Sequence, residues 1–227
     1  MRKSKPTSLE KHKFEEECAR QVLMYCFPDK YSAAQLSESP DIIVPTLSIG
    51  VEVTESILQS VQQNMSRASD ITGKQIDELS EVNKTNISKG RVVAQVASNG
   101  QYVAAFAMWG NTHDLASAYI KKTRKLNANH FSVLRENNLF ITSWMIDEGE
   151  LSDGIQKILS YSANDTFAVY TYHFDHIYIC RENLLVTITL KSQQVKAIQI
   201  PSPVMSGISE TAFTEIFGMT REQYYSR

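Results

Sequence analysis

The chain has 227 residues, of which 42% are hydrophobic and 21% are charged, with a formal net charge of −2 and a pI near 6.2. This is the composition of a globular protein with a real core, and the overall charge does not favour nucleic-acid binding. Three cysteines without CxxC or Cys/His spacing argue against a disulfide framework and against structural zinc. No apolar run approaches the ~18 residues that span a bilayer, and the first residues contain no secretory signal, so we expect a cytoplasmic protein without a membrane partner.

Helical and strand patterns alternate along the first half of the chain. A helix is expected from about Ser8, its N-cap, to about Phe27, where Pro28-Asp29 ends it. Residues 41 to 54 predict a β-hairpin, and a turn centred on Thr46-Leu47 would place Asp41 opposite Glu52. A helix around residues 70 to 83 and a second hairpin, formed by residues 91–97 and 101–108, are expected to follow.

The second half predicts a long helix over residues 113–137, a strand over 139–145 and a helix over 151–161. Further strands are expected over 167–172, 176–180 and 184–190, then a linker and short helices around 209–217 and 220–225. The order predicts an α/β fold with a mixed central sheet flanked by helices. We expect the main domain to cover residues 8–190 and a C-terminal extension to cover 191–227.

Two carboxylates interrupt the predicted first hairpin. Asp41 follows Pro40 at the start of a strand, and Glu52 shares one strand face with Gly50 and Thr54. Adjacent carboxylates repel each other unless a cation lies between them, and hard oxygen ligands of this kind suit Mg²⁺ or Mn²⁺. The alternative is an exposed edge hairpin whose acids are solvated.

A third acid is predicted on the first helix. Glu15 falls within its apolar stripe, whereas Glu16 and Glu17 are expected to point elsewhere. The stripe is formed by Phe14, Cys18, Val22, Tyr25 and Cys26. A carboxylate on a buried face needs a partner, and the alternative is a stripe-edge Glu15 whose head group reaches water.

The predicted long helix also places a charged residue in its apolar stripe, in this case a basic one. Lys122 lies in the apolar stripe, whereas Lys121, Arg124 and Lys125 lie off it, on the side expected to meet solvent or phosphate. The stripe is formed by Leu115, Tyr119, Leu126 and Val133. The alternative for Lys122 is an ammonium group that snorkels along the edge of the helix.

These residues and their order resemble the PD-(D/E)XK nuclease superfamily over about residues 10–145. The resemblance rests on Pro40-Asp41, an 11-residue step across a hairpin to Glu52-Val53-Thr54, a preceding acidic helix, and the helix and strand "YIKKTRKLNANHF" and "NNLFITSWM". It implies a restriction-endonuclease-like core with C-terminal strand and helix additions. It also implies that Asp41 and Glu52 bind Mg²⁺ or Mn²⁺ and that Glu15 supports the site.

One position departs from the family motif. The family places a lysine two residues after the second acid, where this chain has Thr54, which cannot supply a positive charge. If a displaced lysine replaces it, Lys122 is the first candidate and Lys74 the second.

The resemblance implies a metal-dependent endonuclease that hydrolyses phosphodiester bonds, with DNA as the expected nucleic-acid partner, in restriction, repair or phage defence. Thr54 motivates an alternative, a catalytically degenerate nuclease-fold module that binds nucleic acid or a protein partner. The low net charge motivates another, a structural interaction protein with solvated acids. A homodimer or a complex with a partner protein is left open.

Overall fold

The computed structural model describes residues 7–105, 111–128, 132–164 and 169–226. The chain forms two compact units, which are described separately. Unit 1 comprises residues 1–56 and 115–227, and unit 2 comprises residues 57–114. The compact units therefore divide the chain elsewhere than at residue 190.

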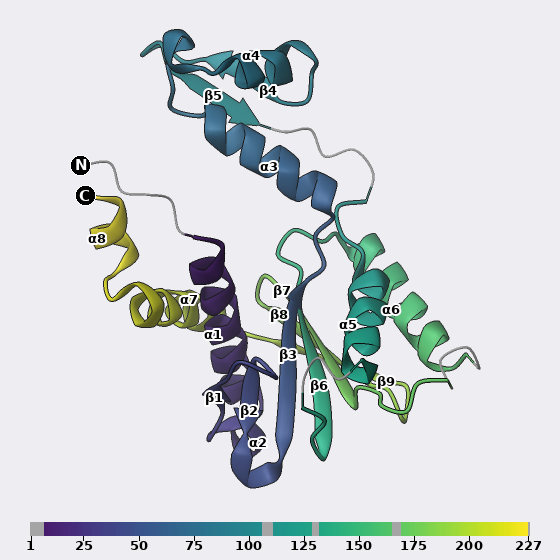
Figure 1. The fold of residues 1–227 in the computed structure, drawn as a ribbon. Helices are drawn as coiled ribbons and strands as arrows, with labels where there is room; N and C mark the ends of the chain where they lie inside the picture. Colours follow the sequence, from purple (N-terminus) through teal and green to yellow (C-terminus); the bar gives the residue numbers. More distant parts are fainter. Residues whose placement is uncertain (1–6, 106–110, 129–131, 165–168, 227) are drawn as a thin grey trace. The chain divides into compact units, whose positions relative to one another are not determined.

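A seven-stranded mixed sheet forms the centre of unit 1, in the order β1-β2-β3-β6-β7-β8-β9 (Figure 1). Strands β3, β6 and β7 are parallel, and the pairings outside them are antiparallel. The expected α/β class with a mixed sheet flanked by helices is confirmed. The strands are β1 (Gln35–Leu36), β2 (Ile42–Val44), β3 (Ile49–Glu55), β6 (Glu136–Thr142), β7 (His176–Arg181), β8 (Leu184–Thr189) and β9 (Gln194–Gln199).

Helices cover the sheet of unit 1 and create an apolar core on each face. On one face, Val51 and Val53 of β3 pack with Val22 and Leu23 of α1. On the other face, the apolar side chains of β6 and β7 pack with those of α5 and α6. The helices of unit 1 are α1 (Ser8–Cys26), α2 (Pro28–Tyr31), α5 (Leu115–Asn127), α6 (Glu148–Ser162), α7 (Ser202–Phe217) and α8 (Arg221–Tyr225), and a 3₁₀ turn, η1 (Pro45–Leu47), links β2 to β3.

Unit 2 is inserted between β3 and α5 and has its own small core of Ala68, Ile71, Leu79 and Val92. Its ends are held together, because Ile57 forms an antiparallel bridge with His113 and the Leu58 N–H donates to the Thr112 carbonyl at 2.9 Å. Its elements are α3 (Gln59–Ile71), η2 (Ile76–Glu78), α4 (Glu81–Ser88), β4 (Val93–Val96) and β5 (Tyr102–Ala105).

Both predicted hairpins are confirmed. In the second, β4 pairs with β5 so that Val93 lies opposite Ala105, and residues 106–108 lie outside the described residues. The helix expected over residues 70–83 is wrong. Helix α3 already ends at Ile71, and Gly73 adopts a φ of 81°, which breaks the helical path before α4 begins.

The predicted long helix ends ten residues early, at Asn127. The Asn127 side chain donates to the Thr123 and Tyr172 carbonyls, and the next strand, β6, begins at Glu136. Val133 therefore lies outside the helix and does not extend its stripe.

Two further expectations need correction near the C-terminus. Val169–Tyr172 forms no strand, and residues 167–168 of that expected strand lie outside the described residues. The stretch after Lys191 is not a linker, because β9 pairs with β8 and α7 packs against α1. The sequence did not predict β9 because the strand lacks an alternation of buried apolar and exposed polar residues: all but one of its six side chains are exposed.

No helix in the described part of the chain is long and apolar enough to cross a membrane.

Candidate active site

The β2–β3 hairpin sets the position of two carboxylates. Ile42 pairs with Val51 and Val44 with Ile49, around the η1 turn, so Asp41 lies opposite Glu52 as predicted. Strand β2 begins only at Ile42, so the end of β3 has a strand neighbour on its β6 side alone. Asp41 provides a hydrogen-bond partner for one backbone group at this free edge, since its Oδ2 accepts a 2.7 Å hydrogen bond from the Val53 N–H.

Glu52 points to the sheet face that α5 covers. It lies beside Leu139 of β6 in the parallel register, and Lys122 of α5 reaches it across the core. The Lys122 ammonium donates to Glu52 Oε2 at 2.7 Å, with the side chains 14% and 8% exposed. The predicted approach of Lys122 to the acids is therefore present.

Burial and the charge of Lys122 shift the pKa of both carboxylates in opposite directions. Burial raises the pKa of Glu52, whereas the Lys122 ammonium opposes that rise and the charge of Asp41 adds to it. Burial likewise raises the pKa of Asp41, and the Val53 N–H and Lys122 oppose the rise. Lys122 thus stabilises the ionised form of both acids, and Asp41 and Glu52 act electrostatically as a pair.

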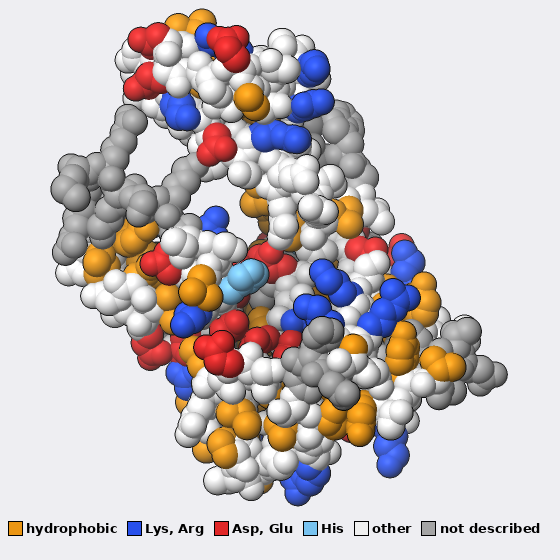
Figure 2. Space-filling model, in the orientation of Figure 1, with side chains coloured by type: hydrophobic (Ala, Val, Ile, Leu, Met, Phe, Trp, Pro, Cys, Tyr) orange, Lys and Arg blue, Asp and Glu red, His pale blue; other side chains and the backbone are white. Residues whose placement is uncertain are grey.

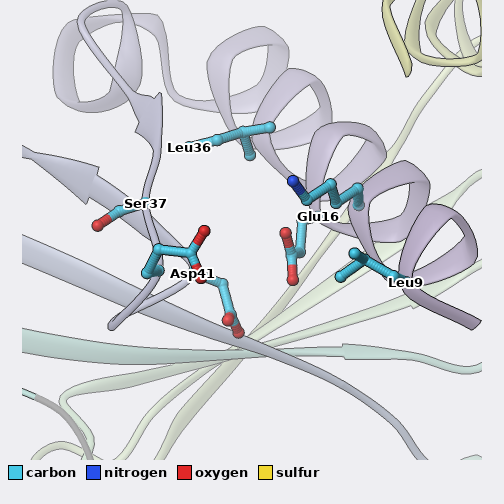
Figure 3. Close-up of a pocket in the computed structure, with 7 residues that line it drawn as sticks. Leu9, Glu16, Leu36, Ser37 and Asp41 are labelled. Atoms are coloured by element: carbon cyan, nitrogen blue, oxygen red, sulfur yellow. The ribbon is translucent and has the colours of Figure 1, made fainter. Parts of the chain in front are cut away.

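The acid of α1 that faces this pair is Glu16, contrary to the expectation for Glu15. Glu16 and Asp41 point toward each other (Figure 3). Burial and then the Asp41 charge raise the pKa of Glu16 to about 7. Glu15 instead lies against Glu55 at the end of β3, where burial and a carboxyl–carboxyl hydrogen bond raise its pKa to about 9.

The error in the helix prediction has a structural cause. A single apolar stripe describes a helix with one buried face, but α1 contacts both β3 and α7. Glu17, expected to point away, is only 1% exposed and bonds Arg20 and Gln21 on its own helix. Tyr25, expected in the stripe, is 47% exposed. No pattern of apolar residues in the sequence identifies Glu16, because it lies at the border between the two faces.

Two predicted candidates remain, Thr54 and Lys74. Thr54 lies two residues beyond Glu52, and its hydroxyl donates to the Glu55 carbonyl at 3.5 Å. Lys74 belongs to unit 2, where its carbonyl accepts from the Tyr102 N–H.

A pocket of about 270 Å³ opens beside Asp41, between the N-terminal half of α1 and the segment from β1 to β2 (Figure 3). Its walls combine two leucines with three acids, one lysine and one serine. The lining residues are Leu9, Lys13, Glu16, Leu36, Ser37, Glu38 and Asp41. Sequence patterns did not indicate this pocket, because its residues come from two elements with no common periodicity.

Charge is segregated around the site. Figure 2 shows acidic side chains gathered where α1 meets the β2–β3 hairpin, and basic side chains beside them over α5. Lys121, Arg124 and Lys125 are exposed on α5, one turn or less from Lys122. A local basic surface of this kind attracts phosphate even on a chain with a net charge of −2.

Asp41 and Glu52 are the residues that could hold a divalent cation of the Mg²⁺ type. Within the described residues, no three His, Cys, Asp or Glu side chains converge into a complete ligand set. Mg²⁺ is commonly bound through one or two carboxylates, with water and substrate phosphate completing the shell. Asp41 and Glu52 each use one oxygen in the hydrogen bonds described above, which leaves a second oxygen on each for a cation.

Comparison of the chain with protein-family models, with curated proteins and with solved structures gave no match, so the fold and the geometry of the site are the basis for assigning a function.

Proposed function

We propose that the protein is a metal-dependent nuclease that hydrolyses phosphodiester bonds in DNA. One observation carries the proposal: Lys122 reaches from α5 to within 2.7 Å of Glu52, which lies opposite Asp41 on the neighbouring strand. Two acids and one lysine from three separate segments thereby meet at one point. The order of the acidic helix, hairpin, helix and strand is also the order that the sequence resemblance implies.

Each residue has a definable role in this chemistry. Asp41 and Glu52 would bind Mg²⁺ or Mn²⁺, which when bound supplies an activated water and polarises the phosphate. Lys122 opposes the rise in the pKa of both acids and would place a positive charge where negative charge develops on the phosphoryl oxygens. Glu16 lies close enough to Asp41 for the Asp41 charge to add to the effect of burial on its pKa, and the resulting pKa of about 7 allows Glu16 to accept a proton near neutral pH.

The basic surface of α5 gives the substrate a direction of approach. Lys121, Arg124 and Lys125 lie on the same helix as Lys122, so a phosphate backbone bound along them would pass beside the acids. Such contacts position nucleic acid without reading its sequence.

The test is cleavage of supercoiled plasmid DNA by the purified protein with Mg²⁺ or Mn²⁺. Asp41→Asn, Glu52→Gln and Lys122→Met should each abolish cleavage, since each removes one member of the constellation. Lys157→Met is the matched control, because Lys157 is an exposed lysine on a different helix, α6, and it should retain cleavage. A wild-type protein that cuts no nucleic acid with either metal contradicts the proposal.

Thr54 favours a second candidate, a nuclease-fold module that has lost cleavage and retains binding. Threonine stands where the family lysine would, and its hydroxyl bonds backbone and carries no charge. Binding of DNA that depends on Lys121 and Lys125, without cleavage, would identify this case.

A further inference from the structure

The pocket beside Asp41 has a lining that suits a part of the substrate other than phosphate. Three of its seven lining side chains are carboxylates and one is an ammonium group, so the pocket repels anions. The basic side chains that attract phosphate lie instead on α5. An occupant of the pocket must therefore be neutral or hydrogen-bond donating.

The pocket is larger than a single ion requires, since its volume is about 270 Å³. Glu16, Glu38 and Asp41 line the pocket, but no three such groups in the described part of the chain come together as metal ligands. The space between them suits a larger organic group. Leu9 and Leu36 are 65% and 38% exposed and supply apolar walls (Figure 3).

We infer that this pocket binds an unpaired nucleobase that carries an exocyclic amino group, next to the scissile phosphodiester. The inference rests on the proposed function. Asp41 belongs to both the pocket and the acidic pair, so a base in the pocket lies one nucleotide or less from the reacting phosphate. Apolar walls hold the faces of an unstacked base, and carboxylate oxygens accept the N–H groups of cytosine, adenine or guanine.

The inference specifies the substrate as well as the ligand. A base inside a duplex is stacked and paired, so its edge cannot enter a pocket of this kind without being extruded. The protein should therefore act on single-stranded or frayed DNA in preference to intact duplex. Thymine presents the carbonyl oxygen O4 where cytosine presents its N4 amino group, and the carboxylates repel that oxygen.

Equilibrium binding in EDTA tests this without cleavage. Fluorescence anisotropy would compare labelled single-stranded dC12, dA12 and dT12 with a 12-base-pair duplex. We expect dC12 and dA12 to bind about tenfold tighter than dT12, the preference that 1.4 kcal/mol of base readout provides, and the duplex to bind more weakly than dC12.

Two variants assign the preference to the pocket. Glu38→Gln and the double variant Leu9→Ser/Leu36→Ser alter exposed side chains, so the fold should be retained. Each should reduce the preference for dC12 over dT12 at least threefold. Glu222→Gln, an exposed acid on α8, is the matched control and should leave the ratio unchanged.

Equal affinity for dC12, dA12 and dT12, or a preference that the pocket variants leave intact, overturns the inference. The plasmid cleavage test is separate. A protein that cuts DNA without base preference loses only the pocket assignment, whereas a protein that binds no nucleic acid loses both.

Discussion

Replacing Lys122 with methionine tests the charge balance at the centre of the site. The ammonium of Lys122 is the partner of Glu52, whose side chain is 8% exposed, and the change leaves that carboxylate buried without it. Removal of one member of a buried pair costs roughly 3–5 kcal/mol, and a charged hydrogen bond alone contributes roughly 1.5–3 kcal/mol. Because Lys122 is 14% exposed and water reaches part of the pair, we expect a loss of about 2–3 kcal/mol in the free energy of unfolding at pH 7.5.

The loss should depend on pH in a defined direction. Without Lys122, the pKa of Glu52 rises further above its ordinary value, so the folded state takes up a proton that the unfolded state releases. A group with a raised folded-state pKa contributes stability below its unfolded pKa and loses that contribution as the pH rises. Lys122→Met should therefore cost less at pH 5 than at pH 7.5.

Urea denaturation followed by circular dichroism at both pH values measures this effect. Lys121→Met, on the same helix but exposed, should change stability by no more than about 0.5 kcal/mol. Adding Glu52→Gln to Lys122→Met should recover most of the loss, because the carboxylate that lost its ammonium partner is then removed as well. The reasoning is refuted if Lys122→Met and Lys121→Met lose the same stability, or if the double variant shows no recovery.

Three other substitutions examine separate features of unit 1. Glu15→Gln removes a carboxyl whose pKa is raised to about 9, so the variant should match the wild type at pH 4.5 and exceed it by about 1–2 kcal/mol in urea denaturation at pH 8; equal stability at pH 8 would contradict the Glu15–Glu55 contact. Thr54→Lys introduces the lysine that the sequence resemblance implies at this position and should keep or increase plasmid cleavage, and loss of cleavage in a folded variant would contradict this expectation. Gly154→Ala places a methyl group 2.5 Å from Leu115 Cδ1 and 3.0 Å from its Cβ, so it should lower stability by about 1–3 kcal/mol, and an unchanged melting temperature would mean that α6 moves away from α5 freely.

The parts of the site that the sequence predicted are those fixed by local rules. Strand alternation and a short turn determine the register that sets Asp41 opposite Glu52. Helical periodicity places Lys122 on the same face of its helix as Tyr119 and Leu126, which are both fully buried. The Lys122 side chain therefore points toward the sheet. Neither prediction requires knowledge of distant segments.

The parts that failed depend on tertiary contacts. The choice between Glu15 and Glu16 depends on where α1 crosses the open end of β3, and the burial of Glu17 depends on α7, nearly 200 residues later in the chain. Strand β9 has exposed, polar side chains, so only its pairing with β8 reveals it. The division into units was also hidden, because the insertion begins directly after β3 without a glycine-rich or proline-rich linker.

The way in which unit 2 leaves and rejoins unit 1 makes the chain modular. The bridge between Ile57 and His113 holds the first and last residues of the insertion close together, so the insertion forms a closed loop between β3 and α5. Replacement of such a loop by a short turn costs little conformational entropy, and domain insertion is tolerated where chain ends meet. Glu52 and Lys122 lie on the two elements that flank this junction. Replacement of the inserted unit by a short turn should therefore leave the acids and the lysine in place.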